Sequence, residues 1–180
     1  GGTLAVNQLL QATATHTTND VVCTKNADGS VTLNGTANAG GALATHTGVG
    51  CISGHKYMVW ANDAYWNAGH TIYSNIPTNG GARSSNTIEQ ASSTGTKTVT
   101  ARAGNGEVFN NQKLYLDCTD LTLALGTTIA DYVYSLEQST AGSGVAWLKQ
   151  YYPSIFNSYQ PYNAGELMSV EASEHVMTGF

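Results

Sequence analysis

Charged side chains are scarce in this 180-residue chain. Only 11% of its residues are Asp, Glu, Lys or Arg, whereas about a quarter are charged in an average globular protein. The seven Lys and Arg are scattered singly and the formal net charge is −5, so there is no basic stripe for a phosphate backbone and nucleic acid is not an expected partner. A surface of hydroxyl and amide groups suits an extracellular or virion protein better than a cytosolic enzyme.

Long apolar runs are also absent. No segment approaches the roughly 20 apolar residues that a membrane-spanning helix needs, and the N-terminus has no charged segment followed by an apolar one. We therefore expect no insertion into a membrane. The sequence ends at Phe180 without a capping feature, and we expect one module of a longer polypeptide.

The three cysteines, Cys23, Cys51 and Cys118, are an odd number without close spacing, which excludes a full disulfide framework. The favoured interpretation is three small buried hydrophobic residues in strands. One disulfide plus a free thiol is the alternative. None of the five histidines stands at a zinc-like interval from a cysteine.

The sequence does contain many short β-prone segments separated by turns rich in Gly and Asn. The clearest pair is 20–26 and 31–37, on either side of Ala27-Asp28-Gly29-Ser30. Asp-Gly tolerates the positive φ angles of a tight turn, so these segments predict a β-hairpin. In the second segment Val31, Leu33 and Gly35 share one face, which we expect to be buried.

Further strands are expected at 56–61, 70–74, 87–92, 96–103 and 113–123. In 96–103 polar residues alternate with a few small or apolar ones, a pattern typical of an edge or half-exposed strand. Many short strands without intervening helices predict a mainly β fold, an antiparallel jelly-roll β-sandwich similar to carbohydrate-binding modules over residues 1–124.

The pattern changes after residue 125. Ile129, Tyr132, Val133 and Leu136 recur at helical spacing. Thr128 can cap this helix, and Asp131 lies three residues later as in a capping box. A second helix is expected at 145–151, stopped by Pro153. We therefore predict a helical hairpin at 125–158, packed on the end or side of the sandwich, and an extended tail at 159–180 that leads to a further domain or an interface.

Motifs for catalysis are missing. The chain has no nucleophile elbow, phosphate-binding loop or zinc-protease helix. Its carboxylates are spread along the sequence, and no motif indicates the pair of carboxylates that a glycosidase needs. We expect no enzyme. Asp117 and Asp120 offer oxygen ligands for Ca²⁺, but a solvated strand end is the favoured interpretation, and no other cofactor is expected.

The segment with the most binding character is 60–73. Aromatic rings offer flat faces on which a pyranose can stack, and Asn, Asp and His supply hydrogen bonds to its hydroxyls. Trp60 is expected in the core, whereas Tyr65 and Trp66 are expected to be exposed on a loop. The candidate glycan-binding residues are Asn62, Asp63, Tyr65, Trp66, Asn67 and His70.

A second aromatic group lies near the C-terminus. Its interpretation is packing between the helical hairpin and the tail, or an interface with the next domain. Its members are Tyr151, Tyr152, Tyr159 and Tyr162, with Pro153 and Pro161.

Three segments form a recognisable pattern together: Asn7-Gln8-Leu9-Leu10, the hairpin from Val21 to Ala37, and Gly54-His55-Lys56-Tyr57. The pattern resembles the β-sandwich module in tail and fibre proteins of phages and prophages of gut bacteria. Two later segments, Asp120 to Gly126 and Tyr162 to Leu167, resemble the segments that follow that module. At Ala124-Leu125 the chain departs from the family, which usually has a Met-Phe pair, and this departure changes packing and not chemistry.

The resemblance implies a non-catalytic module of a virion protein, located in the virion or outside the cell. It transfers no binding residue position by position. The expected function is attachment to a glycan of the bacterial surface, or particle assembly. Alternatives are a purely architectural module that contacts other virion proteins or copies of itself, a secreted bacterial adhesin, and a lysin-type hydrolase.

Overall fold

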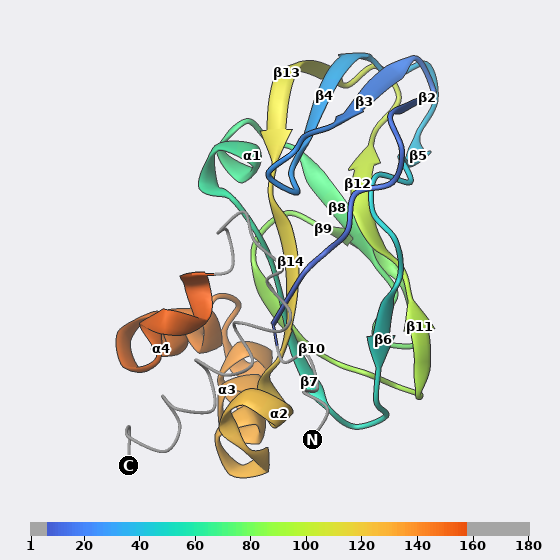
Figure 1. The fold of residues 1–180 in the computed structure, drawn as a ribbon. Coiled ribbons are helices and arrows are strands. Elements are labelled where there is room, and N and C mark those ends of the chain that lie inside the picture. Colours follow the sequence, from blue (N-terminus) through green and yellow to red (C-terminus); the bar gives the residue numbers. More distant parts are fainter. Residues whose placement is uncertain (1–6, 158–180) are drawn as a thin grey trace.

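The computed structural model describes residues 7–157, which form four antiparallel sheets and four α-helices (Figure 1). The central sheet has the order β1 (Asn7–Leu9), β14 (Leu116–Asp120), β7 (Lys56–Ala61), β10 (Thr87–Gln90), and the outer sheet has the order β5 (Gly41–Ala42), β12 (Val99–Ala103), β8 (Thr71–Ser74), β9 (Gly81–Arg83). The top sheet has the order β13 (Val108–Leu114), β4 (Val31–Thr36), β3 (Val21–Lys25), β2 (His16–Thr18), and β11 (Gly95–Lys97) pairs with β6 (Val49–Cys51). The helices are α1 (Asp63–Asn67), α2 (Leu121–Leu125), α3 (Thr127–Ser139) and α4 (Ser143–Tyr151), followed by the 3₁₀ helix η1 (Pro153–Asn157). The fold is mainly β and antiparallel, as predicted.

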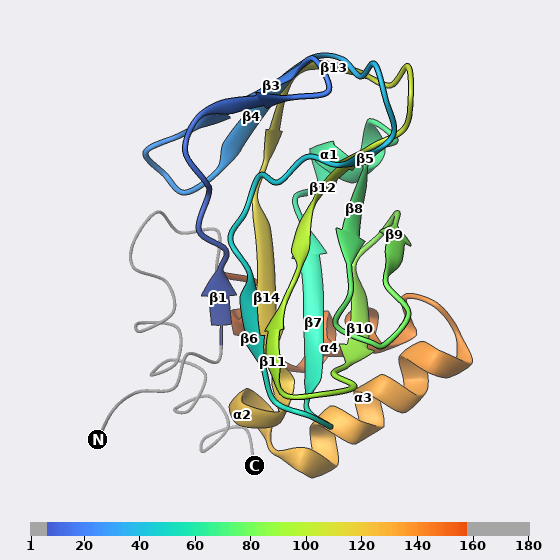
Figure 2. The same cartoon turned by 90° about the vertical axis from the view of Figure 1, so that its right-hand side faces the viewer.

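The central sheet is covered on both faces. In Figure 1 the outer sheet and the β6–β11 ribbon lie on one side of β7 and β14, and α2, α3 and α4 lie on the other. Figure 2 shows the same layers face on, with β6 and β11 nearer to the viewer than β7. The helical hairpin is therefore a third layer that covers one face of the central sheet.

Strand β7 explains why the helices pack there. All six of its residues are buried. Tyr57 and Val59 belong to the core between the sheets, whereas Met58 and Trp60 belong to the core under the helices, because successive side chains of a strand point to opposite faces. Trp60 is 1% exposed, which confirms its predicted place in the core.

The predicted hairpin is confirmed. Strand β3 pairs with β4 from Lys25 opposite Val31, and Gly29 has the positive φ, 88°, that the turn requires. Asp28 also reaches outside the turn, since its Oδ2 accepts hydrogen bonds from Tyr115 Oη at 2.6 Å and from Lys113 Nζ at 2.8 Å. The turn is thereby tied to the junction between β13 and β14.

The expectation of an edge or half-exposed strand at 96–103 fits only its first two residues, which lie in the exposed strand β11 of a two-stranded ribbon, and is wrong for 99–103. The segment divides at Thr98 into β11 and β12, which belong to different sheets. Four of the five residues of β12 are buried. The polar Thr100 is tolerated there because its Oγ1 accepts a hydrogen bond from Thr45 N at 2.8 Å.

The bounds of the strand expected at 113–123 are also wrong. Strand β13 begins at Val108, a break at Tyr115 separates it from β14, and the chain is helical from Leu121. Asp120 causes this last change, because its Oδ1 accepts the backbone N–H of Leu123 at 3.0 Å and so caps α2.

Helix α3 forms where predicted, but the capping box is wrong. The helix begins at Thr127 after Gly126 and has no side-chain cap. Asp131 instead pairs with Lys56 Nζ at 2.9 Å, at the start of β7. The buried face is also rotated from the predicted one, because Tyr132 is exposed and Glu137 is buried.

Glu137 is buried because it caps the next helix. Its Oε2 accepts a hydrogen bond from Gly142 N at 2.6 Å, and its Oε1 accepts from Gly144 N at 3.0 Å and Val145 N at 3.1 Å. These are N–H groups at the start of α4 that have no partner within the helix. A carboxylate there also interacts favourably with the helix dipole.

Gly144 is required where α4 crosses α3. A Cβ at this position would collide with the backbone oxygen of Val133 and would lie 2.9 Å from Ile88 Cδ1. We expect Gly144→Ala to destabilise the protein by about 2 kcal/mol in urea unfolding, since overpacking outweighs the higher helix propensity of Ala. Gly50→Ala is the matched control, because nothing lies within 4 Å of its Cβ, and an equal loss in both variants would contradict this account.

The cysteine expectation is confirmed, since Cys23, Cys51 and Cys118 are all free and buried and lie in β3, β6 and β14, respectively. The predicted tail, with Tyr159 and Tyr162, lies outside the described residues. Within residues 7–157, no helix is long and apolar enough to cross a membrane.

Candidate functional site

The predicted aromatic loop is a short helix, α1, and one of its two aromatic residues is in the core. Tyr65 is 0% exposed, so its predicted exposure is wrong. Its hydroxyl donates a hydrogen bond to Thr71 O at 2.6 Å, and burial raises the pKa of this phenol well above its usual value. The buried, neutral ring is a structural residue.

His70 is also turned inward. It is 5% exposed, its ring stacks on Phe109 with centroids 4.2 Å apart, and its Nδ1 lies 2.6 Å from Glu107 Oε2. The imidazole is thus held between β8 and the start of β13. Its Nδ1 is already hydrogen-bonded to Glu107 and is not available to a ligand at the surface.

The remaining predicted residues divide between structural and surface positions. Asn62 closes the junction of β13 and β14, because its Oδ1 accepts from Tyr115 N at 2.9 Å and its Nδ2 donates to Lys113 O at 3.1 Å. Asp63 and Asn67 are exposed on α1. Only Trp66 is a partly exposed aromatic residue of this group.

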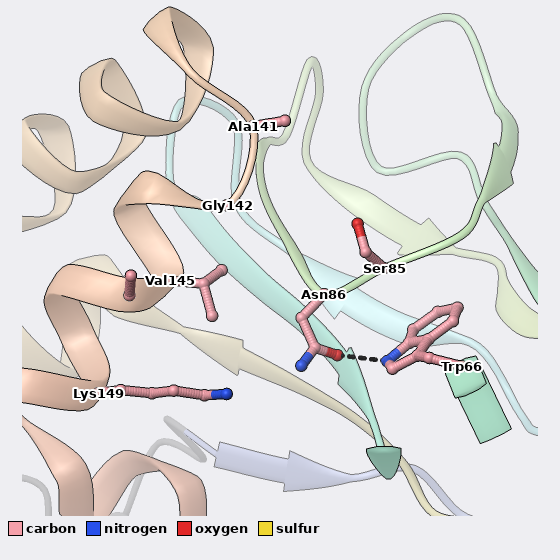
Figure 3. Close-up of a pocket in the computed structure, with 8 residues that line it drawn as sticks. Trp66, Ser85, Asn86, Ala141, Gly142, Val145 and Lys149 are labelled. Atoms are coloured by element: carbon pink, nitrogen blue, oxygen red, sulfur yellow. Dashed lines mark hydrogen bonds between the residues drawn. The ribbon is translucent and has the colours of Figure 1, made fainter. Parts of the chain in front are cut away.

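Trp66 lines an open groove of about 390 Å³ between the β-sandwich and the helical layer. One wall is formed by α1 and the β9–β10 connection, and the other by the α3–α4 turn and one face of α4 (Figure 3). The volume lies at the lower end of the range of about 300–1,000 Å³ that is usual for small-ligand sites. The lining residues are Trp66, Ser85, Asn86, Ala141, Gly142, Val145, Ala146 and Lys149.

Asn86 fixes the sandwich wall of the groove. Its Oδ1 accepts hydrogen bonds from Trp66 Nε1 and from the backbone N–H of Ala61, both at 2.8 Å. The first of these is drawn in Figure 3. The indole ring is therefore held in one orientation, which leaves less conformational entropy to lose when a ligand packs on it.

The helical wall is one face of α4. Gly142, Val145, Ala146 and Lys149 stand at helical spacing, so they lie on the same side of the helix. In Figure 3 the Lys149 side chain extends from α4 towards Asn86. The groove thus combines an indole ring and small apolar side chains with an amide, a hydroxyl and an amine.

Sequence reasoning identified Trp66 but missed Ser85, Asn86 and Lys149. Asn86 follows Trp66 by 20 residues and Lys149 follows it by 83, and no motif connects these positions. The helical spacing of 142, 145, 146 and 149 was the one available signal, since it places these residues on a common face. It does not say what that face meets.

The predicted calcium candidates are not brought together. Asp117 and Asp120 are 0% and 3% exposed, so the favoured interpretation as a solvated strand end is wrong. They stand three residues apart on one strand and so face opposite sides of the sheet. Asp120 caps α2 and its Oδ2 lies 2.8 Å from His55 Nδ1. In the part of the chain that the structure describes, no cluster of three His, Cys, Asp or Glu side chains could hold a metal ion.

Comparison of the chain with protein-family models, with curated proteins and with solved structures gives no match.

Proposed function

We propose that the chain is a non-catalytic virion module of a phage tail, fibre or decoration protein, and that it attaches the particle to a glycan of the bacterial surface through the Trp66 groove. The module is a jelly-roll β-sandwich of the kind found in carbohydrate-binding modules, extended by a helical layer. The predicted resemblance to phage tail and fibre proteins supports the location in a virion, and the groove supports the binding of a glycan.

The single observation that carries the glycan proposal is the fixed indole of Trp66 in an open groove with polar groups beside it. A sugar ring has an apolar face and a rim of hydroxyls, and it is bound by an aromatic ring together with a few hydrogen-bonding groups. Trp66 supplies the ring, while Ser85, Asn86 and Lys149 supply the polar groups. None of the described residues that line the groove is Asp or Glu, which fits binding without cleavage by a pair of carboxylates.

We expect Trp66→Ala to weaken glycan binding by about fivefold, since loss of the stacking surface costs about 1 kcal/mol. The measurement is binding of the 180-residue chain to an array of bacterial surface polysaccharides, followed by calorimetry on the glycans that bind. Tyr132→Ala is the matched control, because it removes an exposed ring from α3 outside the groove. An array without binding, or equal losses in both variants, would contradict the proposal.

An architectural module is the second candidate, and it rests on a different surface. Tyr132 and Tyr151 are 49% and 52% exposed, and both rings contact Trp147, with centroids 5.5 and 4.8 Å away. Exposed aromatic clusters are typical of protein interfaces. Self-association that Tyr132→Ala abolishes, together with an array without binding, would favour this candidate over attachment.

A further inference from the structure

The amide of Asn86 has its orientation fixed by its partners. Ala61 N and Trp66 Nε1 are donors only, and both point at the same atom of the side chain. That atom must therefore be the oxygen, Oδ1, and its two lone pairs are both used. What Asn86 has left to offer is its NH₂ group, Nδ2, which has no hydrogen-bond partner among residues 7–157. Figure 3 shows Nδ2 pointing away from Trp66, to the side on which α4 lies.

Lys149 supplies a positive charge on the opposite wall. Three other cations are neutralised by carboxylates: Lys56 by Asp131, Arg83 by Glu89, and Lys113 by Asp28. Within the described residues, no such pair includes Lys149. Its described contact is instead with the Phe156 ring, whose centroid lies 5.6 Å from Nζ.

The carboxylate at the α3–α4 turn is already committed. Glu137 is buried, and its two oxygens accept three backbone N–H groups of the turn and of α4. It therefore does not compete as a partner for Lys149. The polar atoms that remain for a ligand are Asn86 Nδ2 and Lys149 Nζ, which only donate, and the Ser85 hydroxyl, which donates or accepts.

We infer that the ligand of this groove is a sugar that carries a carboxylate. A carboxylate only accepts hydrogen bonds, has two oxygens, and is bound best by a charged donor. One oxygen accepts from Lys149 Nζ and the other from Asn86 Nδ2, while the sugar ring packs on the Trp66 indole. The inference rests on the proposed glycan function and narrows it to acidic glycans, such as those with uronic or sialic acid residues.

The test compares two pairs of probes: methyl β-glucuronide with methyl β-glucoside, which differ by one carboxylate, and sialyllactose with lactose, which differ by one acidic sugar residue. In calorimetry at low salt, we expect the acidic member of at least one pair to bind about tenfold more tightly, the gain typical of a charge-assisted hydrogen bond. Lys149→Gln should remove this advantage and Lys149→Arg should retain it. Lys25→Gln is the control, since it removes the same charge from the exposed end of β3.

The outcomes separate the two proposals. If neutral and acidic probes bind equally and Lys149→Gln changes neither, the acidic ligand is overturned while the glycan function stands. If an acidic advantage persists in Lys149→Gln but is lost in Lys25→Gln, the acidic site lies elsewhere and the inference is overturned. If no probe of either pair binds and the polysaccharide array is also without binding, both proposals are overturned.

Discussion

Tyr65→Ala is expected to destabilise the protein by about 4 kcal/mol, within the usual range for deleting a buried aromatic side chain. Tyr65 is 0% exposed and packs against both Trp66 and His70, with ring centroids 5.7 and 5.2 Å away. Its removal leaves a cavity in the core between the sheets and leaves the oxygen of Thr71 without this donor. The measurement is the free energy of unfolding from urea titration followed by circular dichroism.

Two variants make this prediction specific. Tyr65→Phe loses only the hydroxyl and should cost about 1 kcal/mol. Trp66→Ala should cost clearly less than Tyr65→Ala, because its indole is partly exposed to the groove. A Tyr65→Ala variant with unchanged stability would contradict the buried position and would restore Tyr65 as a surface residue.

Arg83→Met is the second change with a large expected effect, about 3 kcal/mol at neutral pH, because it breaks a partly buried ion pair and leaves the charge of the buried Glu89 without its partner. Arg83 lies on β9 of the outer sheet and Glu89 on β10 of the central sheet. The guanidinium donates to Glu89 Oε1 from both Nε, at 3.0 Å, and Nη2, at 2.8 Å. The pair therefore joins the two sheets at one edge of the sandwich.

The cost of Arg83→Met should depend on pH. Burial is the largest influence on the pKa of Glu89 and raises it above its ordinary value of 4.5, although Arg83 opposes the shift. Without Arg83 the pKa rises further. A raised pKa contributes stability that is complete below the unfolded value and is lost as the pH rises through the folded value. The difference between wild type and Arg83→Met should therefore shrink as the pH falls from 7 towards 4.5.

The double variant Arg83→Met, Glu89→Gln is the control for this pH dependence. It has no charge at either position, so its difference from wild type should not shrink in the same way. Titration of His46 does not change the differences in stability between these proteins. Burial lowers the pKa of His46 to about 3, so all three proteins lose the same stability as the pH falls below 6.5. A penalty for Arg83→Met that is independent of pH would contradict a buried Glu89.

Local patterns predicted the parts of the fold that depend on neighbouring residues. The Asp28-Gly29 hairpin follows from turn chemistry within four residues, and α4 follows from its spacing and from Pro153. The errors arise where the burial or the partner of a residue depends on residues that are distant in the sequence. Thr100 is tolerated in a buried, interior strand of the outer sheet because Thr45, 55 residues away, donates a hydrogen bond to it, and Asp131 pairs with Lys56 rather than capping its own helix.

The site was predicted only in part for the same reason. Aromatic and amide composition drew attention to Trp66, but it could not show that Tyr65, the next residue, points into the core. On a five-residue helix, adjacent side chains point about 100° apart, so one can be buried while the other lines a groove. The partners Asn86 and Lys149 come from separate elements that meet only after the helices cover the central sheet.

The most direct test of the central claim is a titration of the ¹⁵N-labelled protein followed by NMR. The indole N–H of Trp66 and the side-chain NH₂ of Asn86 give separate signals from the sandwich wall of the groove, and the buried Trp60 gives an internal reference. We predict that sialyllactose or methyl β-glucuronide shifts the Trp66 and Asn86 signals in a saturable way and leaves the Trp60 indole signal unchanged. Binding that leaves both groove signals unmoved, with shifts at Trp147 instead, would contradict this prediction.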